Sequence, residues 1–304
     1  MSGSRNRRPM WQMASVALAG LALVAATAGE ADAQTRARGE REVVPAYEGW
    51  EQNPDGSFNL VFGYFNRNWD REIDIPVGPD NIVEPGPADQ GQPTRFLPRR
   101  NRFLFRVPVP ADFGDQEIIW TLKSPNGETK RAYATLHPDY YMDNNVITAN
   151  NGGGISGEVY ENIAPELVVQ VDEKARKLRV GEAASLVAFA SDDGIPETRP
   201  MPPFDPSRPV NVIPNAATGL RLSWFVLRGP GQVEFDPPQF KTWEDTRDRA
   251  DSPFAPGWKT PDPPPMGRWE VAASFSEPGT YVLRCLAHDG GLMTTEDITF
   301  TVTP

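Results

Sequence analysis

The sequence FSEPGTYVLRCLAHDGGLMTTEDITFTVTP, residues 275–304, indicates the fold class of this chain more clearly than any other stretch. Apolar residues alternate with other residues over Thr280–Ala287 and again over Ile298–Thr303. Residues that recur with this period of two lie on one face of a β-strand. The glycine-rich segment His288–Gly291 separates the two runs. The stretch therefore predicts two antiparallel strands that close a β-sandwich.

The region from Ala164 onward predicts one sandwich of seven strands. Besides the closing pair, short apolar or alternating runs predict strands at Leu167–Val171, Ala184–Ala190, Leu220–Leu227, Gln232–Phe235 and Arg268–Phe275. Trp224 lies on the third of these strands, as in immunoglobulin-like domains. The chain has one cysteine, Cys285, so no intramolecular disulfide can join the sheets. We expect Cys285 to be a small buried residue of its strand.

Short motifs of this region follow one another in a characteristic order: Ser191–Pro196 (SDDGIP), Leu222–Trp224 (LSW), Gly229–Phe235 (GPGQVEF), Ala273–Phe275 (ASF), Pro278–Arg284 (PGTYVLR) and Ala287–Gly290 (AHDG). Over residues 164–304 the series resembles the PKD-like and bacterial immunoglobulin-like repeats of exported bacterial proteins. The resemblance implies a β-sandwich that serves as a spacer, adhesion or interaction module. It carries over no catalytic residues.

Residues 45–142 predict a second all-β sandwich, which matches no named family. Alternating runs predict strands at Phe58–Phe65 and Arg102–Val109. The clearest hairpin joins Glu117–Lys123 to Glu128–Leu136 through the turn Ser124–Gly127. Short strands with turn signals between them, and no convincing helical period, are typical of this fold class.

The N-terminus predicts export. Arg5, Arg7 and Arg8 precede the apolar stretch 14–28, and Ala31–Ala33 forms an A-x-A cleavage site, so we expect removal of residues 1–33 as a signal peptide. Asn6–Trp11 also fits a twin-arginine signal, and both export routes stay open. No other segment approaches the roughly 20 apolar residues of a membrane span. We expect a mature protein in the periplasm or outside the cell, with residues 34–44 as a flexible lead-in.

Residues 143–163 predict a linker between the two sandwiches. This segment is rich in asparagine and glycine, with Asn144-Asn145 and then Asn150–Gly154. Such a linker lets two domains rotate relative to one another. The alternative is a strand or long loop of the first sandwich that ends near Ile155.

Two connections of the second sandwich, residues 199–219 and 240–266, are long and rich in proline. Loops of this length in a compact domain are usually functional or disordered. Aromatic residues occur in the second insertion and just after it: Trp243, Phe254, Trp258 and Trp269. Two interpretations remain open. The aromatic residues form a recognition surface for a partner protein or a glycan, or they fold back and cover an open edge of the sandwich.

Composition argues against catalysis and against nucleic acid as a ligand. The formal net charge is −11 at neutral pH, which opposes binding to phosphate backbones. The two histidines, His137 and His288, lie in different predicted domains, and the chain has no metalloprotease, α/β-hydrolase or phosphate-loop motif. We therefore predict a protein that is not an enzyme and needs no cofactor.

Acidic residues follow two predicted strands that end on the same side of the second sandwich. These residues, Asp192, Asp193 and Asp289, are weak candidates for a calcium site, because calcium binds carboxylate and carbonyl oxygens. The alternative is that they cap turns by accepting hydrogen bonds from nearby backbone N–H groups.

Together these observations predict an exported, non-enzymatic structural or interaction protein of the cell envelope. It would bind a partner protein through the loops of its β-sandwich. The alternative function is carbohydrate binding to an extracellular polysaccharide through exposed tryptophan side chains such as Trp243 and Trp258.

Overall fold

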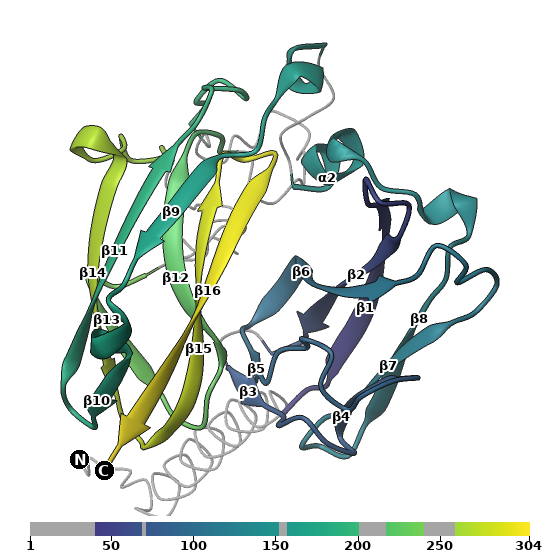
Figure 1. The fold of residues 1–304 in the computed structure, drawn as a ribbon, viewed down its shortest axis with the longest axis horizontal. Helices are drawn as coiled ribbons and strands as arrows, with labels where there is room; N and C mark the ends of the chain where they lie inside the picture. Colours follow the sequence, from purple (N-terminus) through teal and green to yellow (C-terminus); the bar gives the residue numbers. More distant parts are fainter. Residues whose placement is uncertain (1–39, 69–70, 152–156, 201–216, 240–258) are drawn as a thin grey trace, which may run out of the picture. The chain divides into compact units, whose positions relative to one another are not determined.

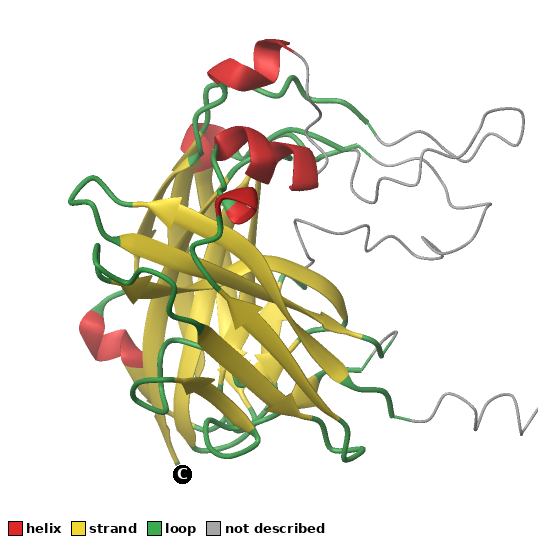
Figure 2. Ribbon diagram, turned by 90° about the vertical axis from the view of Figure 1, so that its right-hand side faces the viewer, coloured by secondary structure: helices red, strands yellow, loops and turns green. Residues whose placement is uncertain are grey.

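The computed structural model describes residues 40–304 except 69–70, 152–156, 201–216 and 240–258 (Figure 1). The predicted signal peptide therefore lies outside the described residues. Residues 42–304 form one compact unit, which consists of two immunoglobulin-like β-sandwiches and the segment that connects them. The all-β prediction is confirmed, and among the described residues helices occur only in the connections between strands (Figure 2).

The first sandwich has two three-stranded antiparallel sheets. One sheet has the order β1-β2-β6, with β1 at Val43–Gln52, β2 at Phe58–Asn66 and β6 at Arg99–Val109. The other has the order β4-β7-β8, with β4 at Asn81–Glu84, β7 at Ile118–Lys123 and β8 at Thr129–Ala134. A short pair is formed by β3 (Ile73–Asp74) and β5 (Arg95–Phe96).

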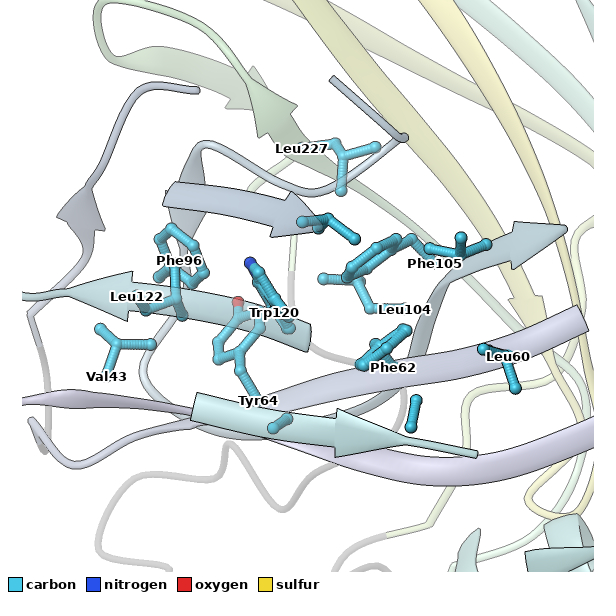
Figure 3. Packing of buried hydrophobic residues seen from close by; sticks show 14 of the residues in the cluster. Val43, Leu60, Phe62, Tyr64, Phe96, Leu104, Phe105, Trp120, Leu122 and Leu227 are labelled. Carbon is cyan, nitrogen blue, oxygen red and sulfur yellow. The ribbon is translucent and has the colours of Figure 1, made fainter. Parts of the chain in front are cut away.

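The predicted hairpin between β7 and β8 is confirmed. Lys123 lies opposite Thr129, and the Ser124 amide donates to the Glu128 carbonyl oxygen at 2.9 Å. This register turns Trp120 and Leu122 into the core, where both are fully buried (Figure 3). The rings of Phe62 on β2 and Phe105 on β6, from the opposite sheet, and of Phe96 on β5 surround Trp120, so aromatic rings fill the centre of this core.

The second sandwich has two four-stranded sheets. One has the order β10-β16-β15-β12, with β10 at Lys177–Arg179, β16 at Met293–Thr303, β15 at Gly279–His288 and β12 at Arg221–Arg228. The other has the order β13-β14-β11-β9, with β13 at Val233–Asp236, β14 at Arg268–Phe275, β11 at Ala183–Ser191 and β9 at Glu166–Gln170. Only β10 and β16 pair in parallel; every other pair among these strands is antiparallel.

The closing strand pair of the sequence forms the hairpin β15–β16. Tyr281, Leu283 and Cys285 are fully buried on one face, as the alternation predicts, and burial raises the pKa of the Cys285 thiol. The second strand is longer than predicted, because it begins at Met293 rather than Ile298. The residues that were missed are mostly polar, and their pairing with β15 up to His288 is what holds them in the sheet.

Helix α2 (Asn144–Asn151) occupies the first part of the segment predicted as a linker without a helix. The Asp143 carboxylate accepts a hydrogen bond from the Val146 amide at 2.9 Å, which caps the first turn. Ile147 then packs in a small apolar cluster with Phe103 of the first sandwich and Leu292 of the second. Residues 144–151 contain few apolar residues, so their sequence shows little of the periodicity that predicts a helix. The helix is stabilised by its packing against the two sandwiches.

The other helical turns in the described ranges are short 3-10 turns: η1 (Pro138–Tyr140), η2 (Gly157–Glu161), η3 (Glu173–Arg176) and η4 (Pro265–Gly267). No helix among the described residues is both long enough and apolar enough to span a membrane.

The two sandwiches contact each other through strand β12. Its face with Trp224 and Val226 packs inside the second sandwich, whereas Phe225 and Leu227 join the core cluster of the first. The Thr94 amide donates to the Leu227 carbonyl oxygen at 3.1 Å, and Arg228 forms a two-pronged ion pair with Asp89. Shared apolar packing of this kind opposes the free rotation that a glycine-rich linker suggests.

Candidate functional site

Three of the four aromatic residues singled out as a binding surface, Trp243, Phe254 and Trp258, lie outside the described residues. The fourth, Trp269, is described. It lies on β14 opposite Ala188, is half-buried, and packs against the core of the second sandwich.

The described ends of the two insertions meet at Thr218. The Arg199 amide donates to Thr218 Oγ1 at 2.9 Å, and the Thr218 amide donates to the Arg199 carbonyl oxygen at 3.2 Å. Thr218 Oγ1 also bonds to the Glu197 carbonyl oxygen, which closes the base of the first insertion. From the second insertion, Thr260 Oγ1 donates to the Thr218 carbonyl oxygen at 2.9 Å. Both threonine side chains are buried, so the two insertions leave the sandwich from one joined base.

This joined base rests on the turn that follows β15. The Gly219 amide donates to the Asp289 backbone carbonyl oxygen at 2.5 Å. Gly290 has a φ of +106°, and a Cβ atom there would lie 2.8 Å from Thr218 Cα. Only glycine therefore permits both the backbone conformation and the close approach of the insertion base.

Side chains fix the turn itself. Asp289 Oδ1 accepts hydrogen bonds from the Gly291 amide at 2.5 Å and from the Leu292 amide at 2.7 Å. His288 Nδ1 accepts from the Gly290 amide at 2.8 Å, so this nitrogen carries no proton and the imidazole is neutral. The motif His288-Asp289-Gly290-Gly291 thus forms a self-capped turn.

The connecting segment covers the other side of the same turn. Asn151 Nδ2 donates to the Gly291 carbonyl oxygen at 2.9 Å. A Cβ atom on Gly291 would lie 2.8 Å from Thr148 Cγ2 and 2.9 Å from Asn162 Nδ2. Helix α2 and the residues after η2 are therefore packed directly against the turn, with no space for a larger side chain.

A buried polar cluster lies at this junction. We define it as five buried residues and the half-buried Asp192, from five segments: Thr148, Asn162, Asp192, Arg221, His288 and Asp289. Burial raises the pKa of Asp289 to about 7, and the charge of Asp192 raises it further, against the opposing effect of the two backbone amides. Burial lowers the pKa of Arg221 to about 10, although the charge of Asp289 opposes this change. Burial and the Arg221 cation together hold the pKa of His288 well below its ordinary value.

The calcium candidates are only partly brought together. Asp192 and Asp289 lie close enough for the charge of one to raise the pKa of the other. Asp193 is exposed and caps the neighbouring chain, because its carboxylate accepts from the Ile163 amide at 3.1 Å and the Ile195 amide at 2.8 Å. Asp192 Oδ2 likewise accepts from the Gly194 amide at 3.0 Å. These are the contacts of turn capping. Within the described ranges, no group of three or more histidine, cysteine, aspartate or glutamate side chains could hold a metal ion.

Four members or neighbours of the cluster were not predicted: Thr148, Asn162, Thr218 and Arg221. Arg221 did leave a signal in the sequence, because it opens the otherwise apolar run Arg221–Leu227, where a buried cation needs an acidic neighbour. The other three are small polar residues of connecting segments, and no local pattern marks them.

Comparisons with known proteins show fold likeness at low scores. No protein-family model and no curated protein sequence matches this chain. Among solved structures, a conjugative transposon lipoprotein from Bacteroides eggerthii is similar over 44% of this chain and 95% of its own, with 9% identity and a TM-score of 0.25. The Yersinia pseudotuberculosis adhesin InvE is similar over 85% of this chain and 58% of its own, with 13% identity and a TM-score of 0.25. The D00-D0 domain of intimin is similar over 86% of this chain and 100% of its own, with 10% identity and a TM-score of 0.26. At these values the likenesses carry no argument about function, and the immunoglobulin-like assignment rests on the sheets themselves.

Proposed function

We propose that this chain is an exported, non-enzymatic structural or interaction protein of the cell envelope that binds a partner protein through the insertions 199–219 and 240–266. The observation that carries the proposal is their joined base, in which Thr218 bonds to Thr260 and rests on the turn at Asp289. Long loops that leave a sandwich from one fixed base lose less conformational entropy on binding than loops with free ends.

Further features support the same proposal. The order of short motifs over 164–304 favours a PKD-like module, a class of domain that serves as a spacer or interaction unit. The two histidines have separate structural settings: His288 is fully buried, and His137 is exposed on the first sandwich, where its Nδ1 accepts from the Asp139 amide at 3.3 Å. Neither is placed as the general base of the other, which favours a protein without catalysis.

Photo-crosslinking in cells tests the proposal. A photoreactive amino acid at position 258 is expected to capture one discrete protein, identifiable by mass spectrometry. The matched control carries the same amino acid at position 133, because Tyr133 is 53% exposed on the first sandwich and far from the insertions in the chain. That control is expected to yield no such adduct.

A deletion of residues 253–258, which keeps Thr260 and therefore the joined base, completes this test. The shortened chain is expected to lose the captured protein in a pull-down with a tagged bait, while its thermal unfolding stays close to that of the full chain. Retention of the same protein by the deletion variant would rule out the second insertion as the binding element.

Carbohydrate binding is the second candidate function, and an aromatic surface on the first sandwich favours it. The rings of Tyr140 and Tyr141 are 50% and 49% exposed. They pack against Tyr47 at 5.3 Å and against Trp50 at 4.9 Å between ring centroids. Trp50 Nε1 donates to the His137 carbonyl oxygen at 2.9 Å, which fixes the platform. Half-exposed rings held in place offer flat apolar faces to a sugar ring.

Fluorescence titration with bacterial polysaccharides tests this second function. We expect a saturable change in tryptophan fluorescence that the double variant Tyr140→Ala/Tyr141→Ala abolishes and Tyr133→Ala leaves unchanged. A titration without any change in the unaltered chain would leave only the protein-binding proposal.

A further inference from the structure

The buried polar cluster contains side-chain atoms that make no hydrogen bond within the described part of the protein. They are Asp192 Oδ1, His288 Nε2, Thr148 Oγ1 and Asn162 Oδ1, while the Asn162 side-chain amide hydrogen-bonds to the Asp289 carboxylate. Asp289 and His288 are 0% exposed, Thr148 is 1% exposed and Asn162 is 7% exposed. Buried polar groups normally find partners, so unsatisfied groups from four segments make the packing of this cluster sensitive to its charge state.

The carboxyl groups are the centre of this cluster. Asp289 at the end of β15 and Asp192 at the end of β11 interact electrostatically, and Asp192 Oδ1 has no hydrogen-bond partner among the described residues. Two carboxylates that share a buried site cannot both ionise without mutual repulsion. A proton on the Asp289 carboxyl group would remove the repulsion and give that group a hydrogen-bond donor. Asp192 Oδ1 and Asn162 Oδ1 are unsatisfied acceptors of the same cluster.

The groups that face Asp289 from each packed segment are few. The charged or titratable ones are Asp192 after β11, with Asp193 beside it, Arg221 on β12 and His288 on β15. Helix α2 contributes the neutral side chains Thr148 and Asn151, the residue after η2 is Asn162, and the insertion base contributes Thr218. His288 stays neutral, so Asp289 is the member of the cluster whose charge can change near neutral pH.

We propose that this cluster is a pH-sensitive lock, in which protonated Asp289 holds helix α2, the residues after η2 and the base of the first insertion against the second sandwich, and ionisation of Asp289 loosens them. The lock acts through the turn, because Asp289 bonds to Gly219 by its carbonyl oxygen and to Gly291 and Leu292 by Oδ1. The inference is independent of any binding partner.

The direction of the pH effect follows from the geometry. Burial raises the pKa of Asp289 from an ordinary value of 3.8 to about 7. The folded chain therefore keeps a proton that the unfolded chain releases, and this stabilisation is fully present below about pH 4. It is lost as the pH rises to about 7 and is absent above that value.

The first measurement is the titration of the Asp289 carboxyl carbon by NMR on the mature chain. The resonance is assigned by its absence from the variant Asp289→Asn, and we expect its midpoint near neutral pH. The asparagine keeps an oxygen that can accept from the Gly291 and Leu292 amides and removes the titrating group. A midpoint below about pH 5, close to that of an ordinary aspartate, would overturn the proposal.

The second measurement is the melting temperature and the amide hydrogen exchange of residues 144–151 between about pH 5 and about pH 8. After correction for the intrinsic rate, exchange in α2 is expected to rise several-fold with pH in the unaltered chain, while the melting temperature falls by a few degrees. Asp289→Asn is expected to remove both changes. Asp193→Asn is the matched control, since Asp193 is an exposed carboxylate of the same region that caps Ile163, and it should keep them. Equal pH profiles for the unaltered chain and Asp289→Asn would refute the lock.

If Asp289→Asn does not fold, Asp192→Asn takes its place and is expected to shift the exchange profile to lower pH.

Discussion

Replacement of Trp120 by alanine is expected to destabilise the chain by about 3–5 kcal/mol, the range for removal of a large aromatic side chain from a core. Trp120 is 0% exposed, and its ring lies against those of Phe105 at 4.9 Å, Phe62 at 6.0 Å and Phe96 at 6.3 Å between centroids (Figure 3). The residues that surround it come from three strands, β2, β5 and β6, so the cavity cannot close by a movement of one strand.

A hydrogen bond adds to this loss. Trp120 Nε1 donates to Asn81 Oδ1 at 3.0 Å, and the amide group of Asn81 is itself fully buried. Asn81 Nδ2 donates to the carbonyl oxygens of Ile75 and Pro93, at 2.9 Å and 2.8 Å, so the side chain cannot turn to find another partner. Trp120→Ala thus leaves a cavity and an unsatisfied buried acceptor together.

Equilibrium urea unfolding followed by far-UV circular dichroism measures the effect. Trp120→Phe is expected to lose less than Trp120→Ala, since it keeps most of the apolar volume but not the donor. Tyr133→Ala is the control, because that ring is 53% exposed on the outer face of β8, and surface changes stay within about 0.5 kcal/mol. A loss below about 1 kcal/mol for Trp120→Ala would mean that the first sandwich is not packed as described.

The second large effect is expected at the contact between the two sandwiches. Arg284 of β15 forms a two-pronged ion pair with Asp297 of β16, at 2.7 Å and 2.8 Å. Its Nη1 also donates to the carbonyl oxygen of Leu104 in the first sandwich. The arginine side chain is 10% exposed and that of Asp297 is 38% exposed. We expect Arg284→Met to cost about 2–3 kcal/mol, below the range for a fully buried pair because water reaches Asp297.

A matched pair of variants separates this contact from ordinary surface pairing. Arg106 also forms a two-pronged pair, with Glu51 at 2.8 Å and 2.9 Å, but within the first sandwich and with a side chain that is 41% exposed. Arg106→Met is expected to cost less than about 1 kcal/mol. Methionine keeps the apolar part of the arginine side chain in both variants. The difference between the two losses of stability therefore reports the hydrogen bonds and ion pairs of the two guanidinium groups. Equal losses from the two variants would show that the bond from Arg284 to Leu104 adds no stability.

Local patterns in the sequence account for most of the strands. Alternation over Thr280–Ala287 placed Tyr281, Leu283 and Cys285 on one buried face, and the turn Ser124–Gly127 placed the β7–β8 hairpin. Strand β10 was not predicted, because its three residues Lys177–Arg179 are too few to show a period. They pair in parallel with β16 of the same sheet, which is distant in the sequence. Aromatic and apolar alternation is a local property of the chain, which is why it can be predicted without the fold.

The sequence gives a partial indication of the contact between the two sandwiches. The run Arg221–Leu227 is apolar at nearly every position, which is typical of a strand covered on both faces. The immunoglobulin-like pattern predicts that Trp224 is buried inside its own sandwich, which accounts for one face only. The opposite face, with Phe225 and Leu227, packs into the first sandwich, and only the tertiary structure identifies that covering layer.

The buried polar cluster shows where prediction from the sequence ends. The aspartates after β11 and β15 could be predicted to follow strand ends, because the ends of strands can be read from the alternation. Arg221, Asn162 and Thr148 come from three other segments, and nothing in their local sequence links them to Asp289. The sequence by itself therefore determined two β-sandwiches and their inward faces, since strand periodicity is local. The tertiary structure alone decided the contact between them, the helix at their junction and the charge state of Asp289, since these depend on burial by residues distant in the chain.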